Sequence, residues 1–84
     1  MELYQKIRKF ILEENFKMQV GSKYVDIVNY KKIRKIEAKE IVVETESKVI
    51  RIIGTNLAIQ KLLSDEIFIS GTILKIDLGS DTYV

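Results

Sequence analysis

The side chains that most often carry out enzyme chemistry are scarce in this sequence. It contains no histidine and no cysteine, which removes the commonest general base, the thiol nucleophile and the usual zinc ligands. Glu44 and Glu46, two apart on a predicted strand, would share a side, as solvated surface carboxylates often do. Gly54-Thr55 and Gly71-Thr72 lack the spacing and the lysine of a phosphate-binding loop. We therefore expect a protein that is not an enzyme and uses no cofactor, metal or small-molecule substrate.

A basic cluster at Lys31, Lys32, Arg34 and Lys35 is the densest charged segment. In a strand its cations divide between the two faces, and few aromatic residues lie nearby to stack bases, so the pattern disfavours nucleic-acid binding. Binding to an acidic protein or an anionic membrane stays open. The plainest interpretation is a solvated edge strand whose lysines discourage unwanted pairing.

The elements that must position these residues begin with a predicted helix. Leu3, Ile7, Phe10, Ile11 and Met18 recur at three- and four-residue spacing, which indicates an amphipathic helix over residues 2–19 that ends at Gly21. Its apolar stripe is typical of packing on the rest of the domain. A contact with a partner or with an anionic membrane is the alternative.

After this helix the sequence predicts strands, because its short runs are rich in isoleucine and valine. They cover residues 24–28, 33–37, 41–46, 48–53, 57–59, 66–70 and 72–78, with turns at residues 46–48 and 64–65. The expected fold is mainly β: an N-terminal helix, then a six- to seven-stranded antiparallel β-roll or meander over residues 24–78. Residues 79–84 form a tail, and the 84 residues make one domain.

The β part contains a two-copy repeat. Residues 50–59 match residues 67–76 at an offset of 17, and each copy reads as strand, Gly-Thr corner, strand. Gly54, Asn56, Leu57 and Gly71 are its structural motif, with Asn56 at a corner. Alternation predicts one inward set, which is Ile50, Ile52, Leu57, Ile59, Ile67, Ile69, Leu74 and Ile76.

The opposite face is also partly apolar, through Val42, Val49, Ile53, Phe68 and Ile73. One helix is too small to cover such a face, so we expect it to contact another subunit and predict a homo-oligomer. These residues and the basic cluster form the predicted interaction surface. No apolar run is long enough to span a bilayer and the N-terminus does not read as a secretory signal, so we expect a cytoplasmic protein, with membrane association open.

The stretch from Tyr24 to Leu78 resembles the YabP/YqfC family of sporulation proteins from endospore-forming bacteria. The likeness rests on residues 28–31 (VNYK), the strand at residues 41–45 (IVVET), and the spacing of apolar residues around Gly54 and Gly71. The YqfC branch is the more similar one. The resemblance implies a non-enzymatic protein of the mother cell. Because relatives are typically encoded beside membrane proteins of the same programme, it also implies a membrane-protein partner.

Overall fold

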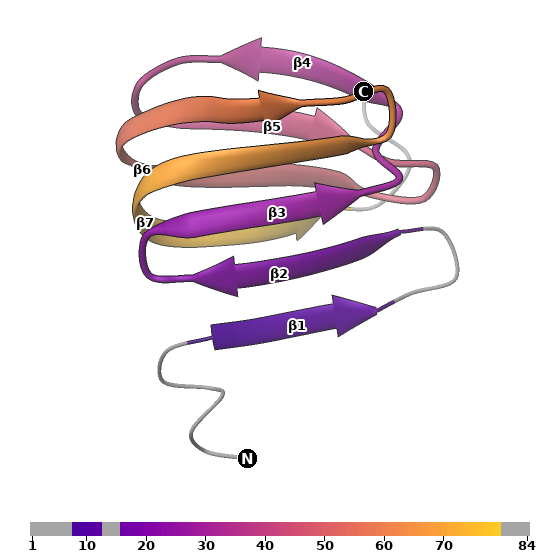
Figure 1. The fold of residues 1–84 in the computed structure, drawn as a ribbon, viewed down its shortest axis with the longest axis horizontal. Coiled ribbons are helices and arrows are strands. Elements are labelled where there is room, and N and C mark those ends of the chain that lie inside the picture. The colour runs from indigo at the N-terminus through magenta and orange to yellow at the C-terminus, as the bar shows by residue number, and fades with distance from the viewer. Residues whose placement is uncertain (1–7, 13–15, 80–84) are drawn as a thin grey trace.

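A computed structural model describes residues 8–12 and 16–79 of the chain. The strands are β1 (Arg8–Leu12), β2 (Lys17–Gly21), β3 (Tyr24–Val28), β4 (Lys32–Ile36), β5 (Glu40–Glu44), β6 (Val49–Leu62) and β7 (Glu66–Gly79). In the described residues they form one antiparallel sheet in the order β1-β2-β3-β7-β6-β5-β4 (Figure 1). The prediction of a mainly β, antiparallel fold is confirmed.

The two longest strands bend in the middle and fold the sheet into two layers. Residues 49–53 of β6 pair with β5, whereas residues 66–70 of β7 pair with β3. The front layer therefore contains β1, β2, β3, the first half of β7 and the second half of β6. The back layer contains β4, β5, the first half of β6 and the second half of β7 (Figure 1).

Backbone crowding explains the two glycines at the bends. A Cβ atom at Gly54 would overlap the carbonyl oxygen of Thr72, and one at Gly71 would lie 2.7 Å from the carbonyl oxygen of Asn56. Gly71 has a φ of 133° and Asn56 a φ of 56°, both in the region that glycine and asparagine tolerate best. The predicted corner residues therefore bend two continuous strands rather than separate four short ones.

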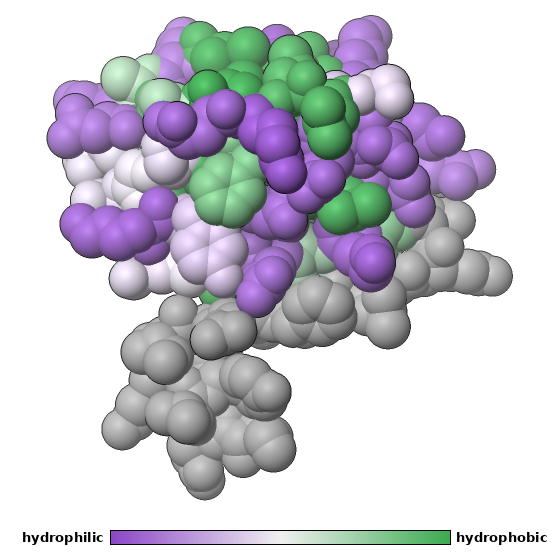
Figure 2. Space-filling view, in the orientation of Figure 1, coloured by the Kyte–Doolittle hydropathy of each residue, from purple (hydrophilic) through white to green (hydrophobic). Residues whose placement is uncertain are grey.

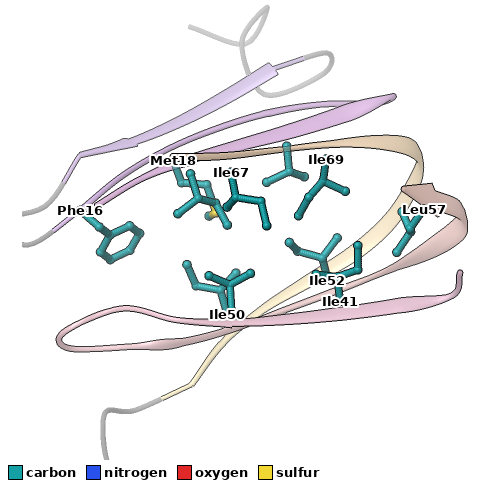
Figure 3. Close-up of a cluster of buried hydrophobic side chains, with 11 residues drawn as sticks. Phe16, Met18, Ile41, Ile50, Ile52, Leu57, Ile67 and Ile69 are labelled. Atoms are coloured by element: carbon teal, nitrogen blue, oxygen red, sulfur yellow. The ribbon is translucent and has the colours of Figure 1, made fainter. Parts of the chain in front are cut away.

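The core lies between the two layers (Figure 3). It contains Phe16, Met18, Val25, Ile27, Ile41, Val43, Ile50, Ile52, Leu57, Ile67 and Ile69. Cross-strand partners such as Ile27 and Ile67, or Ile41 and Ile52, point to the same side because opposite residues in a sheet share a face.

The predicted N-terminal helix is wrong for the residues that the structure describes, since residues 8–12 and 17–21 are strands. Phe16 and Met18 are both 1% exposed. Residues two apart share a face in a strand but point to different sides of a helix, so burying both requires an extended chain. The rest of that prediction, residues 1–7 and 13–15, lies outside the described residues.

The repeat predicted its inward set well, with one error. Ile50, Ile52, Ile67 and Ile69 are fully buried and Leu57 is 6% exposed, but Leu74 is 66% exposed. In the register between β6 and β7, Ile53 faces Lys75 and Gly54 faces Ile73. Leu74 is therefore the extra residue of a bulge, and the partly buried Ile73 packs against the core instead.

Candidate interaction surfaces

The two carboxylates that the sequence placed side by side have different surroundings. Glu44 accepts a hydrogen bond from Arg34 at 2.8 Å, and Glu46 is exposed in the turn after β5. The described residues contain no group of three or more acidic, histidine or cysteine side chains that could hold a metal ion. They also contain no helix that is long and apolar enough to cross a membrane.

The outer face of the back layer is covered by ion-paired side chains of the chain itself. Glu40 accepts hydrogen bonds from Lys35 at 2.8 Å and from Arg51 at 2.9 Å. In the register of β5, Val42 lies opposite Arg51 on β6 and Lys35 on β4. Because the alkyl stems of arginine and lysine can cover apolar surface, this arrangement accounts for the 4% exposure of Val42.

The ion pairs also change what the basic cluster can offer. Lys35 and Glu40 stabilise each other's charged forms: their hydrogen bond raises the pKa of Lys35 and lowers the pKa of Glu40. Arg34 is bound to Glu44. Lys31 and Lys32 are exposed and make no ion pair among residues 16–79. Half of the cluster is therefore already neutralised by the chain's own carboxylates.

The apolar members of the predicted interaction surface do not form one patch. Val49 is 3% exposed, so it offers as little contact area as Val42. Ile53 is partly buried on the back layer, and Ile73 packs against the core. Phe68 lies on the front layer, where its ring stacks on Tyr24 with 5.5 Å between the centroids. The structure distributes these residues over both layers.

A carboxylate pair that sequence reasoning missed lies on the outer face of the front layer. Asp26 on β3 and Glu66 on β7 are 40 positions apart in the chain, but the register sets Asp26 opposite Phe68 and Val28 opposite Glu66. Burial, followed by the hydrogen bond with Glu66 and its charge, raises the pKa of Asp26 to about 6. Its Oδ1 atom is buried with no hydrogen-bond partner among the described residues. Only the strand pairing reveals this pair.

An exposed apolar strip lies where the two layers meet without strand pairing. The Tyr30 hydroxyl donates a hydrogen bond to the Leu63 carbonyl at 2.7 Å, and the Leu57 N–H donates to the Ala38 carbonyl at 2.8 Å. These bonds hold β4 beside residues 58–62 of β6 at both ends. No backbone pairing joins the two edges within the part of the chain that the structure describes. We call this strip the seam.

Large apolar side chains are exposed along the seam. Ile36 is 57% exposed, Leu62 54% and Leu63 48%, and Figure 2 shows hydrophobic atoms gathered at the top of the molecule. A second exposed apolar area lies on the other open edge of the back layer, where Leu74 is 66% and Leu78 41% exposed. Apolar side chains grouped at unpaired strand edges are typical of sites that bind another chain.

The chain belongs to the YabP family, whose profile matches residues 11–83. Membership of this family suggests a sporulation-related protein. No curated protein and no solved structure matches the chain. The family match covers nearly all the strands, so it applies to the fold as a whole and singles out no residue as a site.

Proposed function

We propose that this protein is a non-enzymatic interaction module of the sporulation programme that binds a second copy of itself and a membrane-protein partner. The exposed apolar seam carries this proposal. Its three large side chains, Ile36, Leu62 and Leu63, lie beside two strand edges that pair with no other strand in the described part of the chain. Such a strip can contribute both apolar contact and hydrogen bonds to a partner. The YabP family match supports the sporulation context.

The proposal assigns different contacts to the two open edges. The seam binds the partner protein, while Leu74 and Leu78 on β7 provide the apolar area for a second copy. We place the protein on the cytoplasmic side of the mother-cell membrane and in the YqfC-like branch, as the sequence resemblance implies. Binding at two separate edges allows a copy already bound to the membrane partner to recruit another.

Neither of the other two functions considered from the sequence has an observation in its favour. Nucleic-acid binding would use the basic cluster, but two of its four cations, Arg34 and Lys35, are already paired with Glu44 and Glu40. Membrane binding through an N-terminal helix requires a helix where residues 8–12 and 17–21 are strands.

Light scattering and site-specific crosslinking test the two parts separately. The self-association part predicts a mass above 9.8 kDa that falls with dilution, and a return to the monomer mass in a Leu74→Lys, Leu78→Lys variant. A monomer at every concentration would contradict it.

A photo-crosslinker at Leu62 in sporulating cells should join the protein to a membrane-fraction protein, whereas the same group at Glu46, in the exposed turn after β5, should not. Equal crosslinking from both positions would contradict the seam as the binding surface.

A further inference from the structure

The two layers repeat one another, although the sequence repeat covers only β6 and β7. In the front layer, β3 pairs with β7 so that Val25 faces Ile69. In the back layer, β5 pairs with β6 so that Ile41 faces Ile52. The hairpin before each of these strands also contacts one bend: the Gly71 N–H donates to the Lys23 carbonyl and the Gly54 N–H to the Lys39 carbonyl. The hairpin β2-β3 is therefore the counterpart of β4-β5.

The equivalence identifies matching residues on the outermost strand of each hairpin. Met18 faces Ile27 on the front layer, and Ile33 faces Val43 at the same place on the back layer. Farther along, Val20 faces Val25 and Ile36 faces Ile41. The register of β4 skips Arg34, which forms a bulge. Because of this bulge, Ile33 and Ile36 on β4 occupy the positions that Met18 and Val20 occupy on β2.

The two halves differ in one strand. The edge of β2 is paired with β1, in a register that sets Ile11 opposite Met18. The equivalent edge of β4 is unpaired within the described residues. The exposure of the matching residues follows this difference: Met18 is 1% exposed while Ile33 is only partly buried, and Val20 is partly buried while Ile36 is 57% exposed.

We infer that the edge of β4 accepts one extended strand from a partner protein, in the place that β1 occupies beside β2, and that this strand carries acidic side chains. The added strand would pair with the free backbone groups of β4 and lie over Ile36 and the seam. This inference rests on the proposed function and specifies the partner segment that the seam binds.

The positive charge at the edge of β4 determines which kind of strand can bind there. Lys31 and Lys32 are exposed and make no ion pair among residues 16–79, so they leave the start of β4 positively charged although Arg34 and Lys35 are paired with Glu44 and Glu40. Tyr30, the residue before them, donates its hydrogen bond to the Leu63 carbonyl at this end of the seam. Carboxylates placed opposite cations across a strand pair are favourable, whereas like charges are not. An acidic strand therefore fits, and its apolar residues can pack on the seam.

A second copy of this chain fits poorly at the same edge. If two β4 strands paired antiparallel about a two-fold axis with three or more residues overlapping, every register would set two basic side chains opposite each other, for example Lys32 opposite Arg34 or Arg34 opposite itself. β1, the strand that occupies the matching position in the front layer, would bring Arg8 and Lys9. Self-pairing would thus add positive charge to an edge that is already basic.

The test uses the full chain and a short synthetic peptide of alternating glutamate and valine. In solution NMR the peptide should shift the amide signals of residues 31–36 and slow their hydrogen exchange. Reversing two charges, in the variant Lys31→Glu, Lys32→Glu, should weaken peptide binding by at least about tenfold. Lys75→Glu, which reverses a cation on the other open edge, is the matched control and should leave the affinity unchanged.

Further probes separate strand pairing from simple attraction between charges. The same peptide N-methylated at every second residue keeps its charge but cannot donate the ladder hydrogen bonds, so it should not bind. Equal binding of this peptide, or of single-stranded DNA of matching charge, would overturn the inference. So would slowed exchange in residues 31–36 that appears on raising the protein concentration without peptide, since the occupant would then be a second copy.

The outcomes also distinguish this inference from the proposed function. If Leu62 crosslinks to a membrane protein in cells but the peptide leaves residues 31–36 unchanged, the interaction module stands and the strand-pairing inference fails. If the peptide pairs with β4 but no crosslink depends on sporulation, the edge binds acidic strands and the proposed function fails.

Discussion

At the scale of single residues, Asp26 is the side chain whose charge the fold disfavours most clearly. Its pKa rises from 3.8 to about 6 in the folded protein because of burial and of Glu66 beside it. The folded state therefore binds more protons than the unfolded state between these two values, and the free energy of unfolding falls as the pH rises through this window. Lys61, whose charge lowers the pKa of Asp26, limits the effect.

Replacing Asp26 with asparagine should remove this pH dependence. We expect Asp26→Asn to be about 1–2 kcal/mol more stable than the wild type at pH 7.5 and nearly equal to it at pH 4, a value discounted because the side chain is partly exposed. Urea unfolding across this pH range measures the difference. Every other carboxylate is common to both proteins. If the free energy of unfolding of the two proteins changes with pH in parallel, the pH dependence does not come from Asp26.

Gly54 is the residue at which adding a single methyl group should lower the stability of the fold most. Its Cβ would overlap the backbone carbonyl of Thr72, which cannot move without disturbing the pairing of β6 with β7. We expect Gly54→Ala to lower the free energy of unfolding by about 2–4 kcal/mol. Gly79→Ala is the control, because its Cβ would lie 3.4 Å from the nearest atom, the carbonyl oxygen of Val49. Similar losses for both variants would contradict crowding against the Thr72 carbonyl as the cause, because the loss of unfolded-chain flexibility on its own favours the alanine variants.

At the scale of elements, β2 is a strand in a segment that the sequence predicted to be helical. Met18 is 1% exposed, whereas its neighbours Lys17 and Gln19 are more exposed. Met18→Ala should lower the free energy of unfolding by about 2–4 kcal/mol, whereas Gln19→Ala should change it by less than about 0.5 kcal/mol. Thermal unfolding followed by circular dichroism compares the two. Equal effects would mean that neither face of β2 is preferentially buried.

Strong local signals made most of the strands predictable. Residues 24–28 were predicted to the residue, and the hairpin at residues 46–48 matches a turn in which Thr45 Oγ1 accepts hydrogen bonds from the N–H groups of Ser47 and Lys48. The N-terminal segment was mistaken because its apolar residues satisfy helical spacing as well as alternation. Phe16 and Met18 are both buried in the core between the layers. That burial depends on residues far away in the sequence, which the spacing of apolar residues does not reveal.

The candidate site was less predictable than the strands, because its residues meet only through the topology. Lys31, Lys32, Arg34 and Lys35 were identified as a cluster, but the ion pairs that neutralise half of it depend on the register of β4 against β5. The sequence predicted that the apolar face around Val42 contacts a second subunit. The stems of Arg51 and Lys35 account for its burial within one chain, so the case for self-association depends on the open edges instead.

At the scale of the whole molecule, the fold is two similar hairpins, β2-β3 and β4-β5, joined by a pair of bent strands. Within residues 8–12 and 16–79, the front half has an additional strand, β1, and the back half has no counterpart to it. The described part of the molecule therefore has an open seam beside β4 and an open edge along the second half of β7. Among the described residues no strand pairing joins the two edges of the seam, and hydrogen bonds lie at its ends. The hydrogen bond from Tyr30 to Leu63 is the one that a single substitution removes without changing the backbone.

Tyr30→Phe should therefore loosen the seam without unfolding the protein. The loss of one hydrogen bond at an exposed site should cost about 0.5–1.5 kcal/mol of global stability. Locally, the amides of Asn29 and Leu63, which bond to the Asp65 and Glu66 carbonyls beside this contact, should exchange with solvent faster than in the wild type, while core amides such as that of Ile52 should change only by the global difference. Hydrogen exchange followed by NMR resolves both.

The control for this prediction is Tyr24→Phe, which removes a hydroxyl from a ring that stacks on Phe68 away from the seam. It should leave exchange at Asn29 and Leu63 unchanged. If the pairing of a strand with β4 tightens the seam, adding the acidic peptide to Tyr30→Phe should restore slow hydrogen exchange at Asn29 and Leu63. If Tyr30→Phe accelerates exchange evenly over the whole sheet, the seam is not an independent opening unit, and the two layers separate only when the molecule unfolds as a whole.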